Sequence, residues 1–221
     1  MLMTDFEYDP SYKVDLLLTG DFAYFACPVG GAERSTYKYP VLGQLRGAVR
    51  SIFWKPEIEW VVRSVSILNE IQQTAYVTNE LKAAVGSVTK STKPICVDEN
   101  RTQRQNHVLF DVAYKVVVSP LLVGNGCSET PDKYVSQLRR RIENGECYRT
   151  PHFGRIRYRA DFGTCKGDET PIPLTRDVRM LLGWDQRPKK KVGRVADLEI
   201  RDGVITYDFE HHKMLSKYFD A

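Results

Sequence analysis

The chain has 221 residues, of which 42% are hydrophobic and 27% are charged, and its formal net charge is +4. These values are typical of a globular protein with a substantial core, and a modest positive charge points only weakly to nucleic acid. No run of about 18 apolar residues predicts a membrane span, and the polar start of the chain lacks the pattern of a secretory signal. The five cysteines are scattered without a Cys-x-x-Cys pair, so we expect free thiols, a reducing cytoplasm and no bound metal or cofactor.

Strand and helix patterns alternate along the first three quarters of the chain. Pro40 suits the first turn of a helix, and the residue before Pro56 disfavours helical geometry, so a helix is expected between them. Gly145 follows a second helical stretch as its terminal cap. Runs rich in β-branched and aromatic residues predict strands. The predicted elements are a strand at 13–19, a helix at 40–54, strands at 57–68 and 108–118, a helix at 131–144 and a strand at 153–162.

This order predicts an α+β fold of the ferredoxin-like (RRM-like) βαββαβ kind, with an antiparallel sheet and both helices on one face. Residues 70–107 interrupt the pattern with a polar, irregular stretch, which in a compact domain is typically a functional loop or an extended hairpin. A further hairpin is predicted at Asp202-Gly203. We therefore expect a main domain over residues 10–165 and a small β-rich C-terminal part over 166–221.

The predicted first helix has an unusual face. Its apolar side chains lie on one side, and Arg46 and Arg50 lie on the other beside Gly43 and Gly47. Each glycine costs roughly 1 kcal/mol against alanine inside a helix. Such a basic ridge would let a phosphodiester backbone approach closely and bind the guanidinium groups bidentately. A solvated face whose glycines admit a neighbouring loop explains the same pattern, and surface charge more often serves solubility.

Two further basic stretches are candidates for RNA binding. Arg101 and Arg104 belong to the run Asn-Arg-Thr-Gln-Arg, which could grip a sugar-phosphate chain or form a polar hairpin tip. In the run FGRIRYRADF, Arg155, Arg157 and Arg159 share one face if the segment is a strand. Like charges on one face repel one another, and an anionic partner would relieve the repulsion. We interpret this second stretch as a nucleic-acid surface.

Three residues are candidates for proton transfer. His107 ends the polar stretch and can act as an acid or a base near neutral pH. Tyr37 and Tyr39 share one side of an extended segment, where they could stack on bases, transfer a proton or simply pack against a core. A neutral phenol is a poor base because its reference pKa is about 10. His107 is therefore the better base candidate and tyrosine the better orienting donor.

Four segments occur in an order that is similar to one known family. They are GAERSTYKYP, LRGAVRSIFWKP, ENRTQR followed by VLFDVAY, and RRRIENGECYRTPHFG. From about residue 10 to about residue 165, the sequence resembles CRISPR-associated protein family five of subtype I-C, a branch of the RAMP superfamily of RNA-binding proteins. The C-terminal quarter is similar more loosely, through LLGW and LEIRDGVI.

The resemblance implies a role in CRISPR antiviral defence. Members bind the repeat-derived 5′ handle of the CRISPR RNA in a type I surveillance complex, and most cut the precursor RNA, so we expect a metal-independent endoribonuclease. The implied partners are the CRISPR RNA, the family-seven backbone subunit and the large subunit, with target DNA contacted indirectly and no membrane. Residues 70–107 would form a thumb that hooks the RNA. The alternative is a catalytically inactive structural subunit that caps the RNA 5′ end.

Cleavage without metal needs a base for the 2′-hydroxyl, a cation for the phosphorane and an acid for the departing oxygen. We assign these roles among Tyr37, Tyr39, His107 and Lys115, with an arginine as an alternative to Lys115. Leu42 stands where some members of the family have a tyrosine at the helix start. The residues expected to bind RNA are Arg34, Arg46, Arg50, Lys55, Arg101, Arg104, Arg155 and Arg157.

Overall fold

The computed structural model describes residues 11–28, 33–81, 96–123, 130–185 and 192–215. The strands in these ranges are β1 (Val14–Ala23), β2 (Ile58–Ile67), β3 (Gln72–Leu81), β4 (Arg101–Leu122), β5 (Asp161–Gly163), β6 (Arg176–Asp185), β7 (Val192–Arg201) and β8 (Val204–Thr206). The helices are α1 (Leu42–Ile52), α2 (Val97–Asn100), α3 (Pro131–Asn144) and α4 (Phe209–Lys213). None of these helices is both long and apolar enough to cross a membrane.

The strands form a single antiparallel sheet, in the order β5-β1-β4-β2-β8-β7-β6, with β3 paired to β4 outside this path. Strand β4 is central to it. Its second part lies between β1, with Val14 opposite Val118, and β2, with Ile58 opposite Leu122. The first predicted strand thus pairs with the strand that follows the polar stretch.

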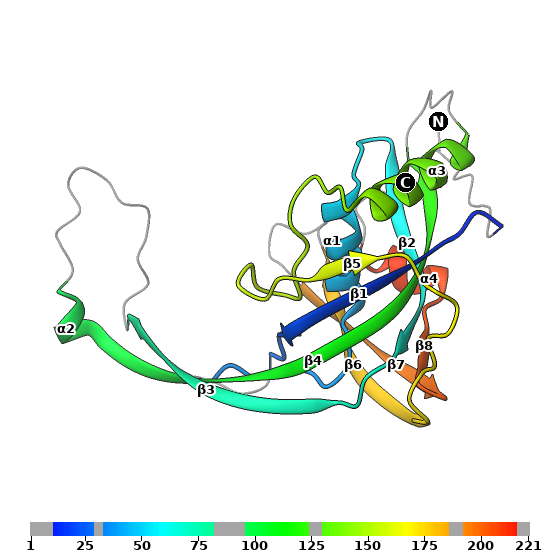
Figure 1. Ribbon diagram of the computed structural model, residues 1–221. Helices are drawn as coiled ribbons and strands as arrows, with labels where there is room; N and C mark the ends of the chain where they lie inside the picture. Colours follow the sequence, from blue (N-terminus) through cyan, green and yellow to red (C-terminus); the bar gives the residue numbers. More distant parts are fainter. Residues whose placement is uncertain (1–10, 29–32, 82–95, 124–129, 186–191, 216–221) are drawn as a thin grey trace.

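Helices α1 and α3 pack against the sheet and against each other (Figure 1). Their buried side chains recur every three or four residues, as an amphipathic helix requires: Leu42, Leu45, Val49 and Ile52 in α1, and Tyr134, Leu138 and Ile142 in α3. Helix α3 has its predicted bounds, and Gly145 closes it with a φ of 66°. Helix α1 ends earlier than predicted, because Phe53 is already extended, with a φ of −144°.

Strands β3 and β4 form a hairpin that extends away from the rest of the sheet (Figure 1). Their register runs from Gln72 opposite Phe110 to Leu81 opposite Arg101. The described part of the polar stretch at 70–107 is therefore largely a two-stranded ribbon, which agrees with the hairpin alternative for the predicted thumb. Residues 82–95 of that stretch lie outside the described residues.

The predicted strand at 153–162 is wrong over most of its length. Only Asp161–Gly163 form a strand, and the preceding residues make a tight turn in which the Phe153 N–H donates to the Tyr158 carbonyl (2.8 Å). Gly154 has a φ of +86°, and an added Cβ there would lie 1.8 Å from the Tyr24 carbonyl oxygen. Phe153 and Tyr158 are five positions apart, so a strand would place them on opposite faces. Both are buried, and the turn allows this, so the alternating sequence pattern does not mark the two faces of a strand.

The C-terminal strands continue the main sheet through the pairing of β8 with β2. The predicted turn at Asp202-Gly203 is present, with φ values of 46° and 74°. Leu182, Ile200 and Leu215 belong to the same hydrophobic cluster as the core of the first three quarters of the chain. The hydrophobic core therefore runs from the N-terminal strand to the last described residue.

Candidate nucleic-acid interface

The two arginines of α1 have opposite environments. Arg46 is only 4% exposed, and its Nε lies 3.5 Å from Oε1 of the equally buried Glu59 in β2. Burial lowers the pKa of Arg46, and the Glu59 carboxylate opposes that shift. The prediction that Arg46 lies on an exposed basic face was wrong. Its position follows Leu42 by one helical turn, and a partner carboxylate inside the fold allows the charge to be buried there.

Arg50 stays at the surface of the same helix. Its side chain is 31% exposed, and its Nη1 lies 3.9 Å from Oε1 of Glu59. The single carboxylate of Glu59 therefore faces two guanidinium groups. The three side chains together carry a net charge of one positive unit. The ion pair orients Arg50 without neutralising this side of α1.

The two glycines of α1 differ in the same way. At Gly43 an added Cβ would lie 3.2 Å from the carbonyl oxygen of Leu182 and 3.3 Å from Cα of Gly183, so glycine lets the helix pack closely against β6. At Gly47 an added Cβ would meet nothing within 4 Å. The prediction of two glycines on the exposed face is therefore right only for Gly47.

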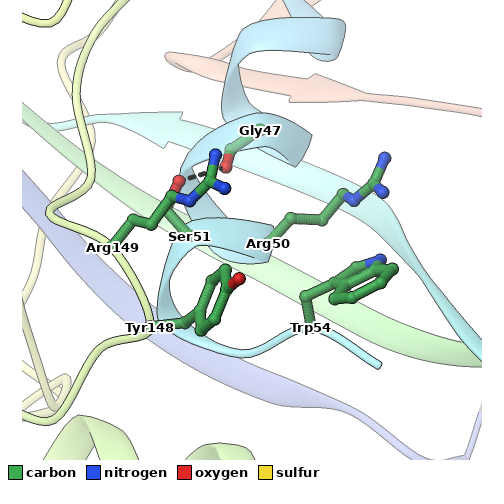
Figure 2. Close-up of a pocket in the computed structure, with 6 residues that line it drawn as sticks. All are labelled: Gly47, Arg50, Ser51, Trp54, Tyr148 and Arg149. Atoms are coloured by element: carbon green, nitrogen blue, oxygen red, sulfur yellow. Dashed lines mark hydrogen bonds between the residues drawn. The ribbon is translucent and has the colours of Figure 1, made fainter. Parts of the chain in front are cut away.

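Gly47 lines an open pocket of about 350 Å³, here called the α1 pocket (Figure 2). Its lining residues are Gly47, Arg50, Ser51, Trp54, Tyr148 and Arg149. Trp54 is 39% exposed and Tyr148 is 60% exposed. Exposed aromatic rings beside guanidinium groups suit the stacking of bases and the binding of phosphates.

Backbone hydrogen bonds fix the two walls of the α1 pocket to each other. The Arg149 N–H donates to the Ser51 carbonyl (2.9 Å), and the Tyr148 N–H donates to the Ile52 carbonyl (3.2 Å). Nη1 of Arg141 in α3 also donates to Ile52 (2.8 Å). These donors satisfy carbonyls that the end of a helix leaves without an intrahelical partner. The chain after α3 is thus attached to the C-terminal turn of α1.

A second basic group lies on the β3–β4 hairpin, where Thr78 pairs with Arg104 and Glu80 with Thr102. Arg34 donates two hydrogen bonds to the Glu80 carboxylate, at 2.9 and 2.6 Å. Nε of Arg104 lies 3.2 Å from the same carboxylate. The bonds from Arg34 are the main cause that lowers the pKa of Glu80. Arg34 and Arg104, both predicted to bind RNA, thus lie close together. The Glu80 carboxylate between them offsets part of their positive charge.

Three tyrosines lie beside this group. The guanidinium carbon of Arg155 lies 4.8 Å from the centre of the Tyr24 ring, and the hydroxyls of Tyr76 and Tyr158 are hydrogen-bonded to each other. Burial is the main cause that raises the pKa of both Tyr24 and Tyr158. These phenols therefore stay neutral near pH 7.

The predicted catalytic residues do not lie in one place. His107 is 39% exposed in β4, with Nε2 3.9 Å from Oε2 of Glu33. Lys115 lies eight positions further along the same strand, or roughly 26 Å at about 3.3 Å per residue. There its Nζ lies 3.9 Å from Asp15 and 3.8 Å from Glu169. Lys115 and His107 cannot both contact one scissile phosphate.

Tyr37 and Tyr39 pack against the hydrophobic core. Tyr39 is 7% exposed, and its hydroxyl accepts a hydrogen bond from Nη1 of Arg176 (3.4 Å). Burial is the main cause that raises the pKa of Tyr37. Within the described ranges, neither phenol has a hydrogen bond to the His107 imidazole. The packing alternative for these tyrosines therefore agrees with their surroundings better than the catalytic one.

The remaining predicted RNA-binding residues are at the surface. Lys55 is paired with Glu57 (3.5 Å), and Arg101 is paired with Asp98 (2.8 Å). Arg157 is exposed, but it lies in the turn before β5 and not on a strand face shared with Arg155. In the part of the chain that the structure describes, no three His, Cys, Asp or Glu side chains are grouped to hold a metal ion.

Trp54, Tyr148 and Arg149 line the α1 pocket, but the sequence patterns did not predict them as site residues. Trp54 lies in the segment that predicted the end of the first helix, and Tyr148 and Arg149 lie in a segment that indicated only the family resemblance. A usable signal was present, because a tryptophan at the end of a helix and a Tyr-Arg pair soon after a glycine cap are both placed where side chains reach solvent. What the sequence lacks is any sign that these two segments meet.

Comparison with protein families gives one match over most of the chain. A family model described as "CRISPR-associated protein (Cas_Cas5)" matches residues 14–217. A protein of Thermus thermophilus named "CRISPR pre-crRNA endoribonuclease Cas5d" is 32% identical over 170 residues, which are 77% of this chain and 72% of that protein. A protein of the same name from Mannheimia succiniciproducens is 28% identical over 186 residues, which are 78% of this chain and 82% of that protein.

Two solved structures resemble the fold. The crystal structure of a functionally uncharacterized protein from Streptococcus mutans has a TM-score of 0.63 at 17% identity, covering 89% of this chain and 92% of that one. The crystal structure of a CRISPR-associated protein has a TM-score of 0.63 at 18% identity, covering 89% of this chain and 91% of that one. At such identities the likeness concerns the fold alone.

Proposed function

The chain belongs to the CRISPR-associated Cas5 family, and from this membership we propose that it is an endoribonuclease that cuts precursor CRISPR RNA and keeps the repeat-derived 5′ handle bound. The observation that carries the proposal is the family match over residues 14–217. Both related proteins described above are named pre-crRNA endoribonucleases. In this role the protein works in the cytoplasm as a subunit of an antiviral complex.

Two surfaces of the fold support RNA binding. The α1 pocket combines Arg50 and Arg149 with two exposed aromatic rings. The β3–β4 hairpin brings Arg34 and Arg104 together around Glu80. Arginine and aromatic side chains together recognise single-stranded RNA, through phosphate contacts and stacking on unpaired bases.

We propose His107 as the general base for attack by the 2′-hydroxyl. Its imidazole is partly exposed on the β3–β4 hairpin, where a substrate hydroxyl can reach it, and its Nε2 lies 3.9 Å from Oε2 of Glu33. An attack by the 2′-hydroxyl explains why DNA would be left uncut. Lys115 is not part of this proposal, because Asp15 and Glu169 surround it and it lies far along β4.

The rival function is a structural subunit that holds the 5′ handle without cutting it. One observation favours it: the side chains of Tyr37, Tyr39, His107 and Lys115 are not assembled around a common point. The two functions share the RNA-binding surface and differ only in the presence of proton-transfer groups.

We further propose a ferredoxin-like core and a thumb for assembly. The order β5-β1-β4-β2 with helices α1 and α3 supports the former, and the projecting β3–β4 hairpin supports the latter. In the complex, the thumb would contact the family-seven backbone subunit while the large subunit binds nearby.

The test is cleavage of the repeat RNA from the protein's own CRISPR array in the presence of EDTA. We expect a single cut, which a 2′-deoxy substitution on the 5′ side of the scissile phosphate should abolish while binding persists. His107→Ala should slow cleavage by about 10²- to 10⁴-fold with little change in affinity, and Lys115→Ala should cut at the wild-type rate. Tight binding without any cut would establish the structural rival instead.

A further inference from the structure

We propose that the α1 pocket binds one unpaired nucleotide of the repeat RNA, with the base against Trp54 and Tyr148 and the phosphate on Arg149 and Arg50. This inference rests on the proposed function, because it assumes that RNA is the ligand. It goes further by assigning a single-nucleotide site and the residues that form it.

The size and shape of the pocket suit one nucleotide. Its volume of about 350 Å³ lies at the lower end of the range for small-ligand sites. Figure 2 shows the Trp54 and Tyr148 rings on the two sides of the opening, with the Arg50 and Arg149 side chains beside them. The floor is helix backbone at Gly47, where no side chain limits the approach of a ring.

The charges of the pocket suit a phosphate. Of the six lining residues two are arginines and none is acidic. In the described part of the chain Arg149 has no ion-pair partner, and its guanidinium lies 5.3 Å from the centre of the Tyr148 ring. The single carboxylate of Glu59 faces both Arg46 and Arg50 and cannot balance the positive charge of both. A phosphate diester would find two donors that the fold has left available.

The site is rigid, as a specific subsite must be. Tyr148 and Arg149 are hydrogen-bonded through their backbone to the last turn of α1. The Ser51 hydroxyl donates to the Gly47 carbonyl (2.9 Å), as Figure 2 shows, so this side chain is turned toward the helix and not into the opening. The carbonyls of Ser51 and Ile52 already accept hydrogen bonds, which reduces the negative character of this helix end toward an anion.

The occupant must be unpaired. Stacking on an aromatic ring requires an exposed base face, which a base inside a helical stem does not offer. Stacking tolerates every base, and no lining side chain is an Asn, Gln, Asp or Glu that would read a base edge. We therefore expect the site to select the position of an unpaired nucleotide in the repeat and not its identity.

The experiment scans the repeat RNA with abasic nucleotides, one position at a time, and measures affinity for the wild-type protein and for Trp54→Leu. Loss of stacking weakens binding by about 5- to 150-fold per base. For the wild type, affinity should fall by this factor when the abasic nucleotide stands at one unpaired position or at either of two adjacent ones. Trp54→Leu should bind intact RNA more weakly than the wild type by the same factor. An abasic substitution at the position to which the wild type responds should then cause no further loss of affinity.

Matched variants separate stacking from damage to the fold. Trp184→Leu removes a tryptophan of β6 that is 48% exposed, against 39% for Trp54, and should behave as the wild type. Tyr148→Phe should keep the affinity that Tyr148→Leu loses, and thermal unfolding should show that all four variants are folded. If Trp54→Leu fails to fold, the pair of Tyr148 variants gives the same comparison.

The outcomes distinguish the two levels of the proposal. A wild-type protein that neither binds nor cuts the repeat would overturn the proposed function and this site with it. A wild type that binds and cuts, with Trp54→Leu and Tyr148→Leu showing the same affinity and the same abasic profile, would overturn the nucleotide site alone.

Discussion

The inner and outer sides of helix α1 carry the same residue types in opposite roles. On the inner side, Arg46 is buried against Glu59 and Gly43 packs against β6. On the outer side, Arg50 is partly exposed and Gly47 faces an open pocket. Arg46 and Gly43 thus contribute to the stability of the fold. Arg50 and Gly47, one helical turn later, line a pocket open to a ligand. Burial decides which role a residue has, and residue type does not.

The largest effect is expected from removing the shared carboxylate. Glu59→Gln leaves Arg46 buried without a counter-charge, and breaking a buried pair in this way costs about 3–5 kcal/mol. Urea unfolding at neutral pH measures the loss. Glu57→Gln is the control, since its pair with Lys55 is at the surface and such pairs contribute about 0–1 kcal/mol. Equal losses in the two variants would show that the inner ion pair is not structural.

A pH dependence is expected from His212 of α4, which is buried against β2. Its Nε2 donates to the Val62 carbonyl (2.8 Å), and burial is the main cause that lowers its pKa to about 4. Because the unfolded chain has a reference pKa near 6.5, it binds more protons than the folded chain between these values. Stability should therefore fall as the pH decreases from about 6.5 to about 4, by roughly 3 kcal/mol.

His212→Gln tests this contribution, because an amide can still donate to the Val62 carbonyl but does not titrate. The difference in unfolding free energy between wild type and variant should change across this pH window and be constant above it. A difference that stays constant from pH 4 to pH 7 would show that His212 does not cause the acid sensitivity.

A smaller effect, with opposite signs, is expected at the two glycines. Gly43→Ala places a Cβ within 3.2 Å of the Leu182 carbonyl oxygen, and this crowding outweighs the gain in helix propensity, for a net loss of about 1 kcal/mol. Gly47→Ala meets nothing within 4 Å and should stabilise the protein by up to about 1 kcal/mol. Thermal unfolding of the two variants measures both changes. A shift of the same sign in both would contradict the distinction between the two sides.

The sequence predicted much of the fold because its signals are local. The repeat of apolar residues and Gly145 predicted α3 with its bounds, and Asp202-Gly203 predicted the C-terminal hairpin. The segment FGRIRYRADF was wrongly predicted as a strand. The alternation of apolar and charged residues indicates which side chains differ in environment, but it does not show whether the backbone is extended. Gly154, with its positive φ, was the contrary local signal.

The candidate site was less predictable because its residues come from separate segments. Arg46 and Arg50 cannot be told apart without knowing that Glu59 lies beneath α1. Trp54 and Tyr148 are more than ninety positions apart in the sequence, and only the attachment of the chain after α3 to the end of α1 brings them together. His107 and Lys115, by contrast, are close in sequence but far apart along one extended strand.

The most direct test of the outer side of α1 as the RNA surface is the salt dependence of repeat RNA binding by Arg50→Gln/Arg149→Gln. Each phosphate contact with a single strand contributes about 0.7 to the slope of log K against log salt, and the two arginines share one phosphate, so the variant should have a slope shallower by about 0.7. A double variant at the exposed Arg140 and Arg179 should keep the wild-type slope. An unchanged slope in Arg50→Gln/Arg149→Gln, or an equal change in the control, would contradict the assignment of this side of the helix to RNA.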